Sequence, residues 1–270
     1  MLHALLQQAG LNGPLDEPME RALAFGFGML VFDAFISHGP LRRRILRAFG
    51  QDKQGAEGER RFLSQLAAKL VGMVFLACVM PLAFRCLADP ELTAGRRFTA
   101  VTGTSQRMVE IGCGYFLYDV VLCLTKYDDN GFDFLLHAVV SCSVFFAASA
   151  LGCMHYFGAA FLMWELSTPF MYIRWLMLKA GLGSSAAMPL ANVAFMLVFF
   201  GSRNVWGPIM TLEFWRESTA ELARPDPALP PAAIYGTRAM CCALNGLNAY
   251  WFAQIVRIAV RGGKPKTKAV

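Results

Sequence analysis

Three polar side chains recur at one-turn intervals in an otherwise apolar segment, residues 132–153. They are Asp133, His137 and Ser141, and their i, i+4, i+8 spacing places them on one face of a helix. An acid one turn before a histidine can hold the imidazole in one tautomer, and a ring held this way can act as a base or nucleophile. Asp119 lies in the preceding apolar segment, across a short connection, so it can face His137. The spacing predicts a polar site at Asp119 and His137; the alternative is that these groups only join two helices by hydrogen bonding.

A second stretch whose residues could take part in chemistry is ELSTPFMYIRW, residues 165–175. Glu165 and Arg174 are nine residues apart, which is about half a turn out of phase on a straight helix. Pro169 removes the helical hydrogen bond to residue 165 and permits a kink, and Ser167 and Thr168 can bond the freed carbonyl groups. The stretch therefore predicts a kinked helix that turns both charges toward one interior. The alternative is that Arg174 only extends to the cytosolic surface of the membrane.

Ionisable residues in the apolar segments share a depth. Depth is estimated from the number of residues to the end of each segment, at about 1.5 Å per residue. One layer then lies roughly 7–11 Å below one membrane face; it comprises Asp33, Lys69, Asp119, His137 and Arg174. A looser layer near the opposite face comprises Arg85, Glu110, Arg203 and Arg238, with Glu165 somewhat deeper. Ionisable groups within membrane spans are costly and are functional candidates by default. The first layer predicts a polar pocket near Asp119, His137 and Arg174.

Apolar segments long enough to cross a membrane must position these residues. The chain has 270 residues, of which 56% are hydrophobic and 16% charged, and its mean hydropathy is +0.43. Soluble domains contain about 25% charged residues. A membrane helix needs about 20 residues, and the apolar segments are residues 20–38, 63–88, 107–126, 132–153, 156–180, 186–207 and 233–258. The sequence predicts an all-α polytopic membrane bundle of about seven transmembrane helices.

Basic residues cluster beside the apolar segments, at 41–61 and 260–270, in a chain with a formal net charge of +6. Their position argues against nucleic acid as a partner and indicates anchors at anionic lipid headgroups. With seven spans, both clusters fall on the cytosolic side, or on the matrix side in a mitochondrion, as the positive-inside rule requires. The eight cysteines contain no CxxC pair, so they are interpreted as small buried hydrophobes and no metal site is expected. No cleavable signal peptide is expected in the first twenty residues.

Five stretches, in this order, resemble the TLC-domain family, which is named for the homology of TRAM, Lag and CLN proteins. They are GYFLYDVVLCL (114–124), FDFLLHAVVS (132–141), ELSTPFMYIRW (165–175), FFGSRNVWGP (199–208) and LNAYWFAQIVRIAVRG (247–262). The chain looks most similar to the smaller TLC-domain proteins, because the longer Lag motif of the ceramide synthases is missing. The expected organisation is an N-terminal segment, 1–61, with one transmembrane helix and a basic loop, a TLC domain, 62–262, and a basic tail, 263–270.

The resemblance implies a barrel of six transmembrane helices around a central lipid cavity, with the N-terminal helix added to it. Ceramide synthases of the family use paired histidines on the fourth helix for acyl transfer from acyl-CoA. Here the pair is His137–Ala138, and the acidic run of those enzymes is not evident. The catalytic candidates are therefore His137 and Asp119, with acyl-CoA as a substrate only if chemistry remains and no other cofactor. The residues expected to contact a bound lipid are Tyr118, Asp133, Ser141, Glu165, Pro169, Arg174, Asn245 and Asn248.

Two functions are consistent with these features. The first is a protein that binds or handles an acyl lipid in an intramembrane cavity, with residual acyl-transfer-type chemistry as a variant and membrane lipids as partners. The second is a non-catalytic accessory subunit of a larger membrane complex, whose partners are other membrane proteins. A transporter or channel ranks third, because the charged layers nearly balance. The final KTKAV, with lysines third and fifth from the end, resembles a dilysine retrieval signal and favours the endoplasmic reticulum, with the mitochondrial inner membrane as the alternative.

Overall fold

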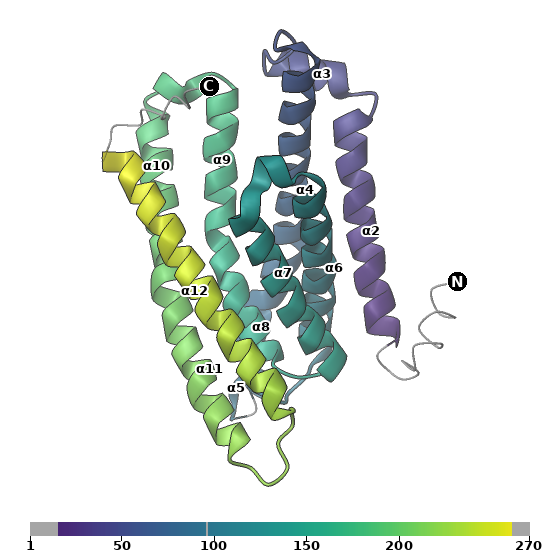
Figure 1. The fold of residues 1–270 in the computed structure, drawn as a ribbon, viewed down its shortest axis with the longest axis vertical. Coiled ribbons are helices and arrows are strands. Elements are labelled where there is room, and N and C mark those ends of the chain that lie inside the picture. The colour runs from purple at the N-terminus through teal and green to yellow at the C-terminus, as the bar shows by residue number, and fades with distance from the viewer. Residues whose placement is uncertain (1–15, 96, 261–270) are drawn as a thin grey trace.

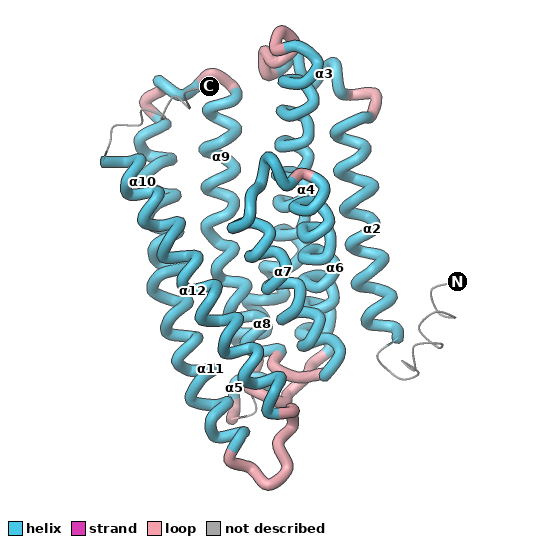
Figure 2. The backbone as a smooth tube through the Cα atoms, viewed as in Figure 1, coloured by secondary structure: helices cyan, strands magenta, loops and turns pink. Residues whose placement is uncertain are grey.

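The structure, a computed structural model, describes residues 16–95 and 97–260. This part of the chain consists of helices and short loops, without strands (Figure 2). The elements are α2 (Asp16–His38), α3 (Arg42–Ala48), α4 (Gly55–Ala88), α5 (Pro90–Thr93), α6 (Gly103–Thr125), α7 (Tyr127–Leu151), α8 (His155–Leu162), η1 (Met163–Ser167), α9 (Thr168–Lys179), η2 (Leu182–Ser184), α10 (Ala187–Phe199), η3 (Phe200–Trp206), α11 (Gly207–Leu222) and α12 (Pro231–Val260). The predicted all-α membrane bundle is confirmed.

The long helices run alternately between two ends of the bundle (Figure 1). α2 stands at one edge against α6, and α10, α11 and α12 form the other side. The end of α12 and the short basic helix α3 lie at the same end of the molecule, while α5 and the α11–α12 loop lie at the opposite end. This arrangement agrees with basic clusters on one membrane side. The KTKAV sequence and residues 1–15 fall outside the described residues.

Fewer than the seven expected helices are long and apolar enough to qualify as membrane spans among the described residues. Among the described residues, α4, α6, α7 and the continuous α10–α11 unit pass as membrane spans, and α2 with α3, bent by 67°, makes a fifth. The unit from α8 to α9 is divided by η1, so neither helix is long enough alone. The helix α12 contains Arg238, Asn245 and Asn248, which lower its hydropathy. The count of seven therefore stays a prediction.

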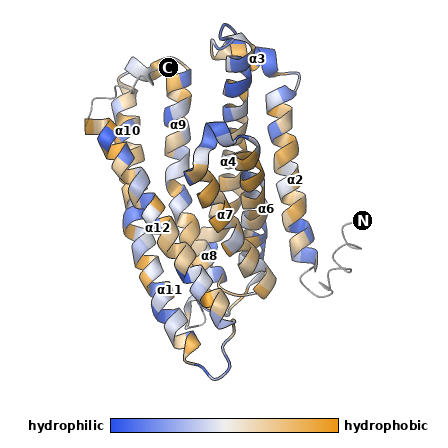
Figure 3. Cartoon of the chain, in the orientation of Figure 1, coloured by the Kyte–Doolittle hydropathy of each residue, from blue (hydrophilic) through white to orange (hydrophobic). Residues whose placement is uncertain are grey.

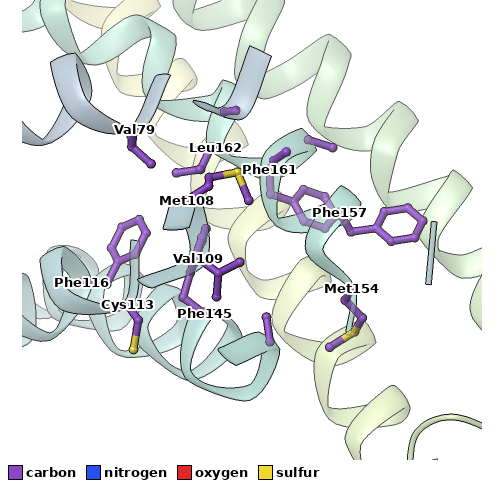
Figure 4. Packing of buried hydrophobic residues seen from close by; sticks show 14 of the residues in the cluster. Val79, Met108, Val109, Cys113, Phe116, Phe145, Met154, Phe157, Phe161 and Leu162 are labelled. Atoms are coloured by element: carbon purple, nitrogen blue, oxygen red, sulfur yellow. The ribbon is translucent and has the colours of Figure 1, made fainter. Parts of the chain in front are cut away.

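The core of the bundle lies between α4, α6, α7, α8 and α11. Its side chains include Met108, Phe116, Phe145, Phe157 and Phe161, which pack together in Figure 4. A smaller cluster fixes α3 to α4 and α9 through Leu46, Phe62, Leu63 and Leu66, with Trp175 packed against it. Many large apolar side chains point outward instead, as expected for helices that face lipid. The interior therefore holds the few polar groups that need partners within the protein.

Candidate functional site

Two irregular turns meet in the middle of the bundle. The first, η1, is a 3₁₀ turn directly before α9, and it lies where Pro169 cannot donate a hydrogen bond to the carbonyl group of Glu165. The second, η3, is a π-helix within the α10–α11 unit, and such segments are frequent at functional sites. The two turns pack against each other. The kink that the sequence predicts at ELSTP therefore takes the form of a 3₁₀ turn.

A buried ion pair connects these turns. Arg203 of η3 donates from Nη2 to Oε1 of Glu165 in η1 at 3.1 Å. Arg203 also donates from Nε to Ser167 at 3.0 Å and from Nη1 to Asn248 at 3.1 Å. Thr168 donates to the other oxygen of Glu165 at 2.6 Å. Glu165 is 9% exposed and Arg203 6%, so the pair is compensated within the protein, as a buried charge requires.

The ring of His137 lies beside this pair. Its Nε2 is 3.6 Å from Oε1 of Glu165. Trp251 packs near the imidazole, with 5.7 Å between ring centroids, and donates from its indole to Asp133 at 2.8 Å. Asp133 therefore bonds to Trp251, whose ring packs near His137, although it lies one turn before the histidine. The neighbouring Ala138 is fully buried and adds no second imidazole to the site.

A small cavity of about 30 Å³ opens between α7, η1 and α12. Its polar lining comes from His137, Ser141 and Glu165, and phenyl rings supply much of the rest. A second void of about 10 Å³ lies next to it, and Phe145 and Phe161 line both; both residues are labelled in Figure 4. A space of this size holds one or two water molecules. An acyl chain therefore needs these phenyl rings to move aside.

Polar atoms without partners gather beside the cavity. Among the described residues, Trp164 Nε1, Asn245 Oδ1 and Asn248 Nδ2 are buried and make no hydrogen bond. Trp164 lines the cavity, and its Nε1 and Asn245 Oδ1 both lie against Gly207. Asn248 already accepts from Arg203. Buried polar atoms in folded proteins almost always have a partner, so these two donors and one acceptor suit a polar ligand group or water.

The structure does not form the expected Asp119–His137 pair. Asp119 accepts a weak hydrogen bond from Cys123 of its own helix, with 4.0 Å between Sγ and Oδ1, and His137 faces Glu165 instead. Tyr118, next to Asp119, points to α2 and donates to Asp33 at 2.9 Å. The prediction failed because the carboxylate beside the histidine comes from η1, not from the preceding helix.

Arg174 does not join Glu165 either. It donates to Asn192 of α10 at 2.6 Å in an exposed contact, which agrees with the alternative of an arginine that extends outward. The chain is regular helix from Thr168 to Lys179, so Arg174 remains out of phase with Glu165. Other residues of the predicted depth layer have partners of their own. Asp33 pairs with Lys126, and Lys69 lies 4.3 Å from the Trp175 ring centroid.

Sequence reasoning missed Arg203 as the partner of Glu165 and placed it near the opposite face. The signal that could have found it is charge balance, because a carboxylate inside an apolar segment needs a cation from another segment. Arg203 also lies between Gly201 and Gly207, close to Pro208, where a helix is open to irregular turns.

Comparisons with known proteins identify the family. The TLC domain model matches residues 65–257. Topoisomerase I damage affected protein 4 of Saccharomyces cerevisiae is 29% identical over 184 residues, which are 65% of this chain and 64% of the relative. An uncharacterized TLC domain-containing protein of Schizosaccharomyces pombe is 26% identical over 192 residues, 70% of this chain and 63% of the relative.

The chain spans a little less than two thirds of the length of these relatives. They are not ceramide synthases, in agreement with the expected similarity to the smaller TLC-domain proteins. TLC-domain proteins are membrane proteins linked to lipid handling. The chain belongs to the TLC-domain family and is similar to its smaller members.

Proposed function

We propose that the protein binds an acyl lipid inside the bundle, with the polar end of the lipid at His137, Glu165 and Arg203. The observation that carries the proposal is the buried ion pair beside the cavity, in the part of the chain that matches a lipid-handling family. Ionisable groups inside a membrane protein are functional candidates by default, and a buried ion pair is weak evidence for added stability. The unpartnered atoms of Trp164 and Asn248 supply donors for a hydroxyl, amide or ester group of the lipid.

The hydrocarbon chain would follow the two voids along α7 and α8. Phe145 and Phe161 border both voids, so rotation of these rings joins them into one apolar channel. The walls of the second void continue to Met154 and Thr237. The lipid enters the site at the expense of phenyl packing, and the bound and free forms therefore differ in the rotamers of these two rings.

The test is mass spectrometry of lipids retained by the full chain after extraction into nanodiscs. One lipid class should be enriched over the surrounding membrane. Ser141→Phe fills the cavity from its polar side and should reduce the retained lipid about tenfold, the effect of roughly 1.4 kcal/mol. Leu212→Phe, on an exposed apolar position, is the matched control and should leave retention unchanged.

A second variant keeps the test independent of folding. Leu244 lines the same cavity, and Leu244→Ala enlarges it without adding bulk. This variant should shift the retained lipid toward longer or bulkier chains. Unchanged retention in Ser141→Phe together with an unchanged chain profile in Leu244→Ala contradicts the proposal.

The position of His137 favours acyl transfer as a second candidate. An imidazole beside a carboxylate is an arrangement that orients a base, and the distance between them is 3.6 Å. On this alternative, His137→Ala abolishes transfer of a labelled acyl group from acyl-CoA and leaves the lipid bound. If wild-type protein transfers no label, binding without chemistry stands alone. If His137→Ala transfers the label normally, His137 is not the catalytic group.

A further inference from the structure

A second, larger pocket lies at the end of the bundle that carries α3. It is bordered by α2, α4 and the connection from α6 to α7, and its volume is about 400 Å³, which is within the range of small-molecule sites. Figure 3 shows hydrophilic residues at this connection and at α3. None of the residues that line this pocket lines the cavity at His137.

The floor of the pocket is the buried carboxylate of Asp33, whose hydrogen bonds are made within the protein. Asp33 accepts from Tyr118 at 2.9 Å and from Ser37 at 3.4 Å. Lys126 lies 3.4 Å from the same carboxylate and balances its charge. The floor is therefore neutral and fixed, and it offers only the remaining donors of Lys126 to a ligand.

The rim carries free charges of both signs. Glu57, Arg60 and Asp128 are exposed and make no hydrogen bond or ion pair with the described part of the chain, whereas the neighbouring Arg61 is already paired with Asp129 at 2.7 Å. Glu57 and Arg60 are one turn apart on α4. A simple anion would meet two free carboxylates here, and a simple cation would meet a free guanidinium. A ligand with a phosphate and an ammonium group can satisfy both.

An exposed apolar stripe on α2 ends one turn before the pocket. Phe27, Val31 and Phe35 are spaced i, i+4, i+8 on α2 and are 68%, 52% and 48% exposed. His38, one turn beyond Phe35, lines the pocket. A polar pocket that continues into an exposed hydrocarbon-like face suits an amphiphile whose head and chains occupy the two parts.

We propose that this pocket binds the headgroup of a phospholipid with a primary ammonium, with its acyl chains along α2. Arg60 and Lys126 hold the phosphate, and Glu57 and Asp128 accept hydrogen bonds from the ammonium. A quaternary ammonium donates no hydrogen bonds and is bound by aromatic cages, whereas Tyr127 is the one Phe, Tyr or Trp among the described residues that line the pocket. The site therefore selects phosphatidylethanolamine over phosphatidylcholine.

The experiment uses the full chain in vesicles of equimolar phosphatidylethanolamine, phosphatidylcholine and phosphatidylglycerol, followed by nanodisc extraction and counting of retained lipids. Phosphatidylethanolamine should be enriched about fivefold, the size expected for charge contacts at a part-exposed site. Glu57→Gln with Arg60→Gln should return the ratio to that of the vesicle. The control pair Arg85→Gln with Glu91→Gln removes the same charges from exposed positions at the opposite end of α4 and on α5, and should preserve the enrichment.

Two further measurements decide the chemistry and the site. Stepwise N-methylation of the headgroup should reduce the enrichment with each N–H that is lost. The enrichment should survive Ser141→Phe, which blocks only the central cavity, so the result does not depend on the function proposed above. Equal retention of the choline lipid, preference for phosphatidylglycerol, or enrichment that persists in Glu57→Gln with Arg60→Gln overturns the proposal.

Discussion

Arg203 and Glu165 form an ion pair between a π-helix and a 3₁₀ turn, with 3.1 Å between Nη2 and Oε1. Each residue therefore sits where its helix departs from regular geometry, and each is nearly inaccessible to solvent. The pair fixes the relative rotation of two helices in the apolar interior, where an unpaired charge cannot be solvated by water.

Removal of one member of this pair should destabilise the bundle strongly. Arg203→Met leaves the Glu165 carboxylate buried without a cation, and the expected loss is about 3–5 kcal/mol of unfolding free energy. Glu165→Gln added to Arg203→Met removes the uncompensated charge and should recover most of that loss. Thermal unfolding in detergent measures the two variants.

The part-exposed pair Arg42–Glu59, at 3.2 Å, provides the control. Arg42→Gln should cost less than about 1 kcal/mol, because solvent screens that pair. An Arg203→Met protein as stable as the Arg42→Gln protein would mean that the interior pair is not formed.

Close backbone contact holds α2 against α6. A Cβ atom added at Gly26 would lie 2.6 Å from the carbonyl oxygen of Gly114, which is too close for any carbon atom. Gly26→Ala should therefore push the helices apart and cost about 1–3 kcal/mol. Gly28, two residues further, has no atom within 4 Å of the added carbon, so Gly28→Ala should stabilise the helix by about 0.5–1 kcal/mol. Thermal unfolding should show shifts of opposite sign, and equal shifts would contradict the packing.

The sequence predicts what one helix contains better than how two helices meet. Pro169 predicts the irregular turn at η1, because the missing N–H is a property of that residue alone. The i, i+4 spacing places His137 and Ser141 on one face, and both line the cavity. The partner of His137 depends on the rotation of a separate helix, which no spacing within α6 or α7 fixes.

The π-helix bears on why the sequence does not identify Arg203 as the partner of Glu165. A π turn accommodates an extra residue and shifts the phase of everything that follows it. Counting along 186–207 assigns Arg203 a depth but no facing direction, and η3 turns it toward Ser167 and Asn248. Nothing local in FGSRNVW specifies a π turn rather than an α turn.

The predicted topology can be tested by cysteine labelling in sealed vesicles. Lys53 precedes α4 and Arg257 lies in the last turn of α12, at the same end of the bundle (Figure 1). Lys53→Cys and Arg257→Cys should react with an impermeant maleimide from one side, and Asp226→Cys in the α11–α12 loop from the other. Cys78 and Cys242 are exposed and are changed to serine in the background. Reaction of positions 53 and 257 from opposite sides would exclude an odd number of spans with this orientation.

Pro169→Ala provides a test of the 3₁₀ turn that carries Glu165. The alanine N–H can bond the carbonyl group of Glu165 and extend α9 backward as a regular helix. That change rotates Glu165 away from Arg203, so the variant should lose stability and retained lipid although it gains a backbone hydrogen bond. Pro81 lies within α4 at an exposed position, so Pro81→Ala should stabilise that helix by about 1–3 kcal/mol. Proline removal should therefore have opposite effects at the two positions, and stabilisation at both would show that η1 does not position Glu165.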